Sequence, residues 1–415
     1  MKLRALVLAL AAAWPVVRAQ DLGANINSRY VVESVEVAPS HTSGLSRTLR
    51  EDMKKLVGEK LNQSLLDSLK ERLRQETGAR LVRQKLSRGE KPDTVKVTFE
   101  LRYGKKTVDV NIPKLAYLSR QGFSGGANLE ANFAGNTVGF GYVNDGEALV
   151  ERYAGIHGYY ERKDLWLGRI GFRFDAQDYS TQWNDTTLAA LGTGGLAGTA
   201  EASGIYRARM NFEPALTVRL VGPLTWIGGV SFQRLETQYP AAHIQGANAV
   251  VQSLRLRQQW RESGFVQTLD AEYGLHAAIK ALDSDFSYTR HQFDVNYGFK
   301  DGPHQVVLRA GGGLLNGQAP YFERFSAGNL TVLRGWSKWD LTPTGASRLA
   351  YGSAEYRYKW AMAFYDTGTA WDRDGPATLR HSVGIGVRTG EFFLALAFPL
   401  QDHHVTPLFM AGLNF

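Results

Sequence analysis

The sequence predicts a membrane β-barrel of roughly 14–18 antiparallel strands, preceded by a small α+β domain with the element order β-α-α-β-β. Three observations support this fold class. After an N-terminal leader, no apolar run reaches the roughly 18 residues that a membrane-spanning helix needs. The chain holds 44 Gly, 18 Tyr, 20 Phe and 9 Trp, a composition typical of barrels with aromatic girdles. Beyond residue 106, apolar and polar residues alternate with a period of two, which indicates half-buried strands.

Residues 1–19 are predicted to be a signal peptide. A basic start is followed by an apolar run from Ala5 to Val17 and by a small-residue cleavage site at Val17-Arg18-Ala19. The run is too short to cross a bilayer as a stable helix. An uncleaved membrane anchor is the alternative. The leader therefore predicts export, and the exported part is either soluble or a barrel.

Charge and cysteine content exclude several classes of function. The chain has 0 Cys, so it has no disulfide framework, no thiolate metal site and no cysteine nucleophile. The net charge of +8 is carried by the residues before Thr107. No basic-aromatic motif accompanies this charge, so no nucleic-acid partner is expected. The basic region fits either a periplasmic surface near anionic lipid or a partner, or a solvated surface.

The small domain is predicted to occupy residues 27–104. Its apolar residues follow helical spacing in two stretches and alternate in the last strand. In the second helix, Asn62 is the expected N-cap, Leu65, Leu66, Leu69 and Leu73 form one face, and Gly78 is the expected stop. Two such helices can cover one face of a three-stranded sheet. The expected elements are a strand at Tyr30–Val37, helices at Ser46–Leu61 and 62–78, and strands at Ala79–Leu86 and Thr94–Tyr103.

Residues 107–415 are predicted to form the barrel. In each strand-like run one face is apolar and aromatic, while the other is charged or glycine. A soluble β-sandwich also alternates, but the last strand favours a barrel. There Phe409, Ala411, Leu413 and Phe415 alternate to a C-terminal aromatic residue, and strands in lipid must leave no open edge. At about 10 residues per strand, the length suits roughly 14–18 strands.

Thirteen strands can be assigned from the pattern, and those between Val108 and Val143 are ambiguous. A Gly/Ala-rich segment from Thr193 to Ser203 is expected to be a mobile loop. The assigned strands are Leu149–Gly158, Leu165–Ala176, Ile205–Arg219, Thr225–Gln238, Ala249–Trp260, Val266–Ala278, Asp285–Phe299, His304–Leu315, Arg348–Tyr358, Met362–Trp371, Arg380–Arg388, Glu391–Pro399 and Pro407–Phe415.

The stretch from Phe325 to Trp336 is neither strand nor helix by its pattern. Gly328 and Gly335 permit tight backbone geometry, and Arg334 lies between the apolar residues Leu333 and Trp336. A solvent-exposed loop has no need of such residues. We therefore expect a loop around 325–340 that folds inward, with its cation held by a carboxylate.

Several motifs in this part of the chain resemble those of the outer membrane protein 85 superfamily (the bacterial surface antigen family, which includes BamA, TamA and the two-partner secretion transporters). The sequence Leu333-Arg334-Gly335-Trp336 matches its loop motif, with Leu and Trp as conservative departures, and Phe364-x-Asp366-x-Gly368 matches its strand motif. The β-α-α-β-β order of the small domain resembles a single POTRA domain. Further matching stretches are Gly352–Tyr356, Ser382–Arg388 and Leu394–Leu400.

The resemblance implies that the barrel has about sixteen antiparallel strands. It also implies that the loop folds into the barrel and that Arg334 pairs with Asp366. Arginine offers a carboxylate two parallel hydrogen bonds, and Phe364, Asp366 and Gly368 share one face by period two. This pair either braces the wall or also takes part in gating. Glu355, Arg357 and Arg388 are expected to join the lumenal network, and Phe409, Leu413 and Phe415 to form the C-terminal barrel signal.

The resemblance also implies a function in outer-membrane protein insertion or polypeptide translocation, without ATP, through a seam between the first and last barrel strands. The implied location is the outer membrane, with the POTRA-like domain in the periplasm. The implied partners are membrane lipid, an unfolded outer-membrane or secreted polypeptide, and periplasmic proteins that bind the POTRA-like domain. A dedicated secretion or surface-display pore is one alternative, and a passive porin-like or structural barrel is another.

No catalytic, cofactor or metal site is expected. The nine His are scattered, and no Gly-x-Ser-x-Gly sequence is present. The pair His403-His404 could bind a metal, but a solvated turn is the preferred interpretation. We therefore expect that the protein is not an enzyme.

Overall fold

The computed structural model describes residues 29–38, 45–77, 81–102, 107–165, 169–191, 205–237, 242–262, 264–400 and 406–413. The chain divides into two compact units between Tyr103 and Gly104. The predicted leader, the segment 193–203, His403-His404 and Phe415 lie outside the described residues. Within the described part, no helix is both long and apolar enough to cross a membrane.

The N-terminal unit is a three-stranded sheet with two helices. Its strand order is β1-β3-β2, with β1 parallel to β3 and β2 antiparallel to it. The element order β-α-α-β-β is that predicted from the sequence. The bounds are Val31–Ala38 for β1, Arg47–Lys55 for α2, Gln63–Thr77 for α3, Leu81–Arg88 for β2 and Thr94–Arg102 for β3.

The two helices and one face of the sheet enclose a shared apolar core. Leu73 from α3 and Phe99 from β3 are both 0% exposed. Asn62 Oδ1 accepts a hydrogen bond from Ser64 N at 3.0 Å, as expected of an N-cap. The prediction was wrong for Leu65, which is 50% exposed because it points away from the core. Its neighbours Leu66, Leu69 and Leu73 form the buried face.

The first helix is shorter than predicted, since the sequence pattern placed its end at Leu61. It ends at Lys55, and Gly58 adopts a φ of +91°, which a helix cannot contain. The chain then runs beside β1, where Gly58 N donates to Val32 O at 2.8 Å and Leu61 N donates to Tyr30 O at 2.8 Å. Leu61 remains in the core at 1% exposure. It therefore packs from an extended segment and not from a helix.

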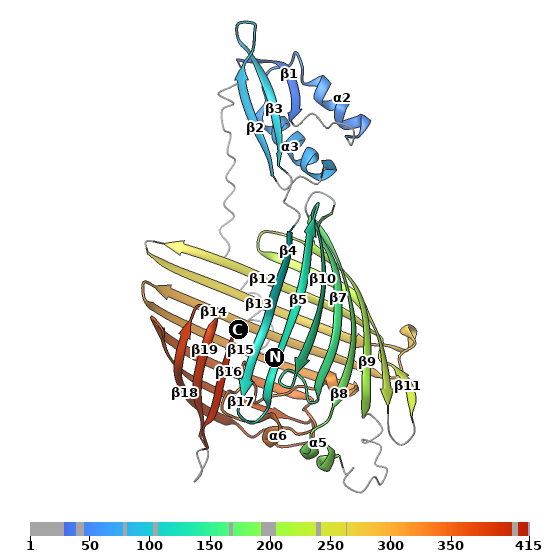
Figure 1. Ribbon diagram of the computed structural model, residues 1–415, viewed down its shortest axis with the longest axis vertical. Helices are drawn as coiled ribbons and strands as arrows, with labels where there is room; N and C mark the ends of the chain where they lie inside the picture. The colour runs from blue at the N-terminus through green and yellow to red at the C-terminus, as the bar shows by residue number, and fades with distance from the viewer. Residues whose placement is uncertain are drawn as a thin grey trace, which may run out of the picture. The chain divides into compact units, whose positions relative to one another are not determined.

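The second unit is a closed antiparallel barrel (Figure 1). The short β11 and the following β12 both pair with β10 in one register, so they are a single strand interrupted at Ala247-Asn248. Counted in this way, the described strands form a sixteen-stranded barrel, which confirms the predicted fold class. The bounds are β4 Thr107–Leu118, β5 Gly122–Phe133, β6 Asn136–Asp145, β7 Arg152–Leu165, β8 Ile170–Gln182, β9 Tyr206–Arg219, β10 Leu224–Thr237, β11 His243–Gly246, β12 Ala249–Glu262, β13 Phe265–Ala278, β14 Ser287–Asp301, β15 His304–Gln318, β16 Arg348–Tyr358, β17 Ala361–Trp371, β18 Arg380–Thr389, β19 Phe392–Leu400 and β20 Leu408–Leu413.

The alternation of the sequence matches the two faces of the wall. On β17, Tyr365 is 42% exposed on the outer face, while Asp366 is 0% exposed on the inner face. On β18, Ile385 is exposed and Ser382 is buried in the same way. One end of the barrel has tight turns such as Gly302-Pro303, and the other end has the longer connections.

Near the start of the barrel, one ambiguous region is resolved and two assignments differ from the pattern. The ambiguous region from Val108 to Val143 forms β4, β5 and β6. The strand predicted at Leu165–Ala176 begins only at Ile170. The strand predicted from Leu149 begins at Arg152, because residues 146–151 form a loop that the Asp145 side chain orders. Asp145 Oδ1 accepts from Glu147 N at 2.7 Å and from Ala148 N at 3.1 Å.

The barrel closes over a short seam between its first and last strands. Within the described residues, which end at Leu413, β4 and β20 pair where Leu115–Leu118 faces Met410–Leu413. Strands β14 and β15, in contrast, pair along their entire lengths. Pro113, which lacks a backbone N–H, lies at a register shift in β4. Among the described residues, 107–111 of β4 pair with β5 and with no strand on the side of β20.

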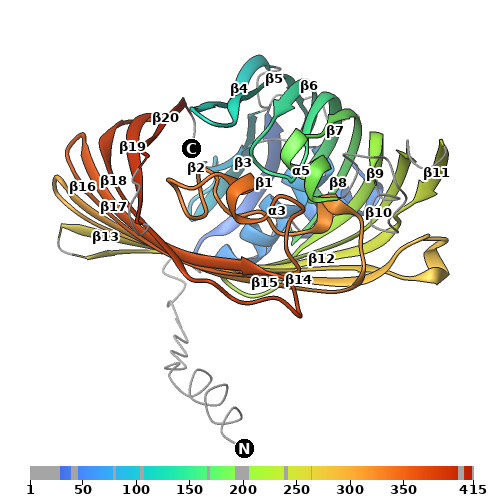
Figure 2. The same cartoon turned by 90° about the horizontal axis from the view of Figure 1, so that it is seen from below.

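The connection between β15 and β16, residues 319–347, folds into the ring of strands (Figure 2, orange). It contains the short helices η5 at Tyr321–Glu323 and α6 at Lys338–Leu341. Phe325 and Leu333 from this segment join an apolar cluster with Tyr206 and Tyr288 of the wall. We call residues 319–347 the inward loop. Two further helices lie in connections at the same end of the barrel, namely α5 at Asp185–Ala190 and η4 at Lys280–Leu282.

The core assignment of the N-terminal unit can be tested with two leucines of one helix. Leu73→Ala should lower the free energy of unfolding of this unit by about 2–5 kcal/mol, because it leaves a cavity. Leu65→Ala should change it by less than about 0.5 kcal/mol, because Leu65 is exposed. Hydrogen–deuterium exchange of residues 45–102 in the full-length protein measures both changes. Equal effects of the two substitutions would contradict the assigned core.

Candidate functional site

The tip of the inward loop is a tight turn that its own residues close. Asn329 Oδ1 accepts hydrogen bonds from Thr331 N at 2.9 Å and Val332 N at 2.8 Å. Gly328 has a φ of +90°, and a Cβ at this position would lie 2.7 Å from the backbone of Ser337. Gly328 is therefore required by the backbone. Leu333 also adopts a positive φ, +57°, which is a strained conformation for a leucine and is held here by burial.

Arg334 anchors the inward loop to the barrel wall. Its Nε and Nη2 donate to the two carboxylate oxygens of Asp366, each at 2.8 Å. Its Nη1 donates to Glu355 Oε2 at 2.6 Å, and its backbone N–H also donates to Asp366, at 2.9 Å. Arg334 is 4% exposed and Asp366 is 0% exposed. This fork geometry is the strongest form of an arginine–carboxylate pair.

Three further groups complete the surroundings of this guanidinium. Ser353 Oγ accepts from Arg334 Nη2 at 3.0 Å. The ring of Phe364 lies beneath the guanidinium, 3.6 Å from its centroid to Cζ. Glu355, which is shared with Arg334, also contacts Arg357 Nη2 at 2.5 Å through its other oxygen. Two buried carboxylates are thus balanced by two arginines.

The residues next to Arg334 fit the wall closely. Gly335 has a φ of +92°, and an added Cβ would lie 3.1 Å from the Ala397 side chain and 3.3 Å from that of Ser382. The Ser382 hydroxyl donates to Arg334 O. Trp336 Nε1 donates to His381 O at 3.0 Å. The motif from Leu333 to Trp336 therefore contacts strands β16 to β19 with both its backbone and its side chains.

The other residues singled out in the sequence lie as follows. Gly368 is on the inner face of β17 with Phe364 and Asp366, where a Cβ would lie 3.0 Å from Ala350 O. Arg388 is on β18, with its guanidinium over the Phe393 ring at 5.2 Å. On β20, the Phe409 ring lies 6.1 Å from that of Tyr117 across the seam. Leu413 pairs with Leu115.

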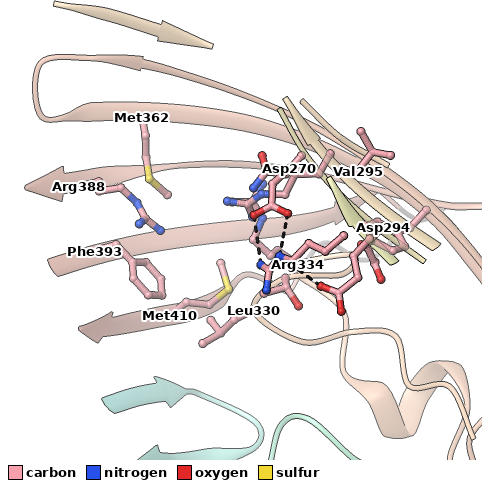
Figure 3. A pocket seen from close by; sticks show the side chains of 15 residues that line it. Asp270, Asp294, Val295, Leu330, Arg334, Met362, Arg388, Phe393 and Met410 are labelled. Atoms are coloured by element: carbon pink, nitrogen blue, oxygen red, sulfur yellow. Dashed lines mark hydrogen bonds and ion pairs between the residues drawn. The ribbon is translucent and has the colours of Figure 1, made fainter. Parts of the chain in front are cut away.

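A cavity of about 350 Å³ lies beside Arg334 in the lumen (Figure 3). Asp270, Asp294 and Arg388 line it together with apolar residues that include Leu330 and Met410. Its charged groups are largely paired, for example Arg255 Nη2 with Asp270 Oδ2 at 3.2 Å and Tyr351 OH with Asp294 Oδ1 at 2.6 Å. In the described residues, no group of three or more His, Cys, Asp or Glu is placed to hold a metal.

Several buried polar residues in the inward loop or in contact with it were not indicated by the sequence. Glu323 accepts hydrogen bonds from Tyr288 OH at 3.0 Å and contacts His276 Nδ1 at 3.1 Å. Lys338 is 1% exposed, and its ammonium donates to Leu149 O. Glu147 accepts from Leu330 N at 2.6 Å. The one feature of the sequence that could have indicated these residues is a charged residue within an apolar stretch, as in Phe322-Glu323. That feature does not identify the residue to which the charged side chain is bonded.

Comparison with known proteins places the barrel among outer-membrane folds. Residues 247–404 match the Omp85 superfamily domain, which confirms the resemblance derived from the motifs. BamA from Haemophilus ducreyi lacking POTRA domains 1–3 is similar, with 13% identity, a TM-score of 0.64, and coverage of 93% of this chain and 84% of that chain. CdiB from Acinetobacter baumannii has 13% identity and a TM-score of 0.58 over 92% and 74% of the two chains. CdiB from Escherichia coli has 12% identity and a TM-score of 0.52 over 99% and 95%. No curated protein sequence matches this chain.

The Arg334 cluster predicts a large and non-additive effect of substitution. Arg334→Ala leaves Asp366 buried without its cation, so it should lower the free energy of unfolding of the barrel by about 3–5 kcal/mol. Adding Asp366→Asn should recover part of this loss, because the unpaired charge is then removed. Titration of each variant with urea, followed by heat-modifiable gel migration, measures the free energy of unfolding of the single and the double variant. As a control, Arg173→Ala removes a half-exposed lumenal pair with Asp175 and should cost no more than about 1 kcal/mol. Additive effects at Arg334 and Asp366 would contradict the cluster.

Proposed function

Because this chain belongs to the Omp85 superfamily, we propose that it inserts or translocates polypeptide at the outer membrane, without ATP, through a gated barrel. The observation that carries this proposal is the short seam between β4 and β20. All other neighbouring barrel strands pair over longer stretches within the described residues. Within the described residues this join has fewer paired residues to separate than any other pair of neighbouring barrel strands, so we propose that the wall opens there.

The exposed edge of β4 supports the same proposal. Within the described residues, 107–111 of this strand pair with β5 on one side and with no strand on the other. Its outward side chains there are apolar, with Val108 at 70% and Val110 at 77% exposure. A strand edge with free N–H and C=O groups pairs with an extended polypeptide. We propose that a client segment docks along this edge.

The inward loop supports gating over passive flow. It fills part of the lumen and is fixed there by Arg334, whose partners are all buried. A passive porin has an open, water-filled channel. In this proposal the Arg334 cluster both braces the wall and determines when the loop can move. A passive barrel remains the competing function, and it predicts steady conductance whatever residue occupies position 334.

We propose that the N-terminal unit is a POTRA domain in the periplasm that receives the client or a partner protein. The start of β1 is covered by residues 58–61. The outer edge of β2 has no strand partner in the described residues, and Leu81 and Leu86 on it are 41% and 38% exposed. Addition of an extended segment along β2 follows from this arrangement.

Two roles within the superfamily differ in what reaches the seam. An insertase releases a membrane protein sideways into lipid, whereas a dedicated secretion pore passes a partner through the lumen. The apolar outward side chains at the free β4 edge favour the insertase, because a client docked there already faces lipid. A secretion pore predicts transport of one dedicated partner and no effect on other barrels.

The proposed function can be tested in proteoliposomes with an unfolded outer-membrane barrel as client. We expect the protein to accelerate client folding by at least about tenfold over empty liposomes, measured by heat-modifiable migration of the client. A disulfide between Leu115→Cys and Leu413→Cys should abolish this acceleration, because it locks the seam. Residues paired across antiparallel strands lie within disulfide range. The chain has no other cysteine, so the lock is specific.

Addition of a reductant to the locked protein should restore the acceleration and serves as the control. Acceleration that persists in the oxidised, locked protein would overturn the role of the seam. No acceleration by the wild-type protein, together with vectorial passage of a dedicated partner, would support the secretion pore. No acceleration together with large conductance unaffected by Arg334→Ala would support the passive barrel.

A further inference from the structure

Glu147 lies in the loop between β6 and β7 and contacts the tip of the inward loop from the opposite side to Arg334. Its Oε1 accepts a hydrogen bond from Leu330 N at 2.6 Å. Its Oε2 lies 2.5 Å from Lys114 Nζ. Glu147 is 3% exposed, although neither its loop nor its partners belong to the motif around Arg334. One buried carboxylate therefore joins the inward loop to Lys114.

Lys114 extends this connection to the first barrel strand. It lies on β4, directly before the four residues that pair with β20. Its Nζ also donates to Asp145 Oδ2 at 2.9 Å, and Asp145 in turn orders the backbone of Glu147 at 2.7 Å. The position of Glu147 is thus fixed by the end of β6 and by β4 together.

A second contact ties the same region to the tip. Gln121, in the turn between β4 and β5, is 5% exposed, and its Nε2 donates to Gly328 O at 2.6 Å. Arg152 Nη2 donates to Gln121 O at 2.5 Å, and Arg152 Nη1 donates to Phe123 O at 2.8 Å. Both ends of the turn at Gly328 are therefore held by the first strands of the barrel.

The Leu330 side chain lies behind the seam. It belongs to a buried apolar cluster to which both sides of the seam contribute. Figure 3 shows Leu330 beside Met410 and Phe393. The other members are Ala116 and Leu118 of β4, Met362 and Phe364 of β17, and Ala395 and Ala397 of β19.

These contacts place two anchors on one short segment. Leu330 is bound to the β4 side through Glu147, and Arg334 is bound to β16 and β17 through Glu355 and Asp366. Strands β18, β19 and β20, and the seam itself, lie between these two sides of the wall. The segment from Gly328 to Trp336 is therefore a strap across the inner face of the seam.

We propose that Glu147 is a positioning residue that ties this strap to the first barrel strand, so that the seam opens only when the strap is released at one of its two ends. In this proposal Glu147 acts through Leu330 and Lys114. This inference deepens the proposed gating function. It rests on that function in one respect, namely that the wall opens at the β4–β20 seam.

The test measures opening without any client, in planar lipid bilayers containing the full-length protein. Glu147→Ala removes both contacts and should raise the frequency of channel openings on the order of tenfold. Glu147→Gln keeps an acceptor for Leu330 N but loses the charge toward Lys114, so it should give an intermediate increase. The matched control is Glu130→Gln, which changes a lumenal carboxylate that accepts from Tyr159 OH at 2.6 Å. This control should open as rarely as the wild type.

The route of opening is tested in the same bilayers with the Leu115→Cys and Leu413→Cys pair. In Glu147→Ala, oxidation of this pair should suppress the added openings, and reduction should restore them. Heat-modifiable migration verifies that each variant is folded, and if Glu147→Ala fails to fold, Glu147→Gln carries the same test.

Two results would overturn the inference. One is an opening frequency in the folded Glu147 variants equal to that of Glu130→Gln. The other is openings that persist with the seam locked, since they would then pass through the lumen. The bilayer measurements contain no client, so they test the role of Glu147 separately from client folding. A failure of the wild type to accelerate client folding in proteoliposomes would overturn the proposed function and leave the bilayer result intact.

Discussion

The buried ion cluster of Arg334, Asp366 and Glu355 is the interaction on which the rest of the site depends. Charges buried to this degree gain little net stability from pairing, because each has lost its water. They are costly to separate, however, since removal of one partner leaves the other buried without compensation. The cluster therefore specifies where the inward loop lies. An inward loop held elsewhere would leave Asp366 without its cation and Glu355 with Arg357 alone.

This placement matters because the barrel is weakest at its closure. A barrel in lipid must leave no open backbone edge, yet β4 and β20 share only a short stretch of pairing. The strap from Gly328 to Trp336 adds side-chain contacts behind that stretch, through Leu330 and its apolar neighbours. The described backbone pairing between β4 and β20 is thus supplemented by contacts from the inward loop. This arrangement fits the proposed function, in which the wall opens without ATP.

Much of this fold followed from the sequence, for identifiable physical reasons. Period-two alternation indicated which face of β17 turns inward, so Phe364, Asp366 and Gly368 could be placed on one face from the sequence alone. Helical spacing identified the core of the small domain, but it could not separate buried Leu66 from exposed Leu65, which are adjacent. It also could not show that Leu61 packs from an extended segment after Gly58. Glu147 was not predicted, because alternation describes one strand and gives no neighbour across a lumen. Its partner Leu330 is 183 residues away in the chain.

The central claim is that release of the inward loop opens the seam, and a distance across the seam tests it most directly. Spin labels at Phe123→Cys on β5 and Ile385→Cys on β18 lie on exposed outer positions with the seam between them. Four strand spacings separate them, about 20 Å. Pulsed electron paramagnetic resonance should give a single narrow distance for the parent protein and an added, longer population when Arg334 is replaced by Ala. An identical narrow distribution in both proteins would contradict the account.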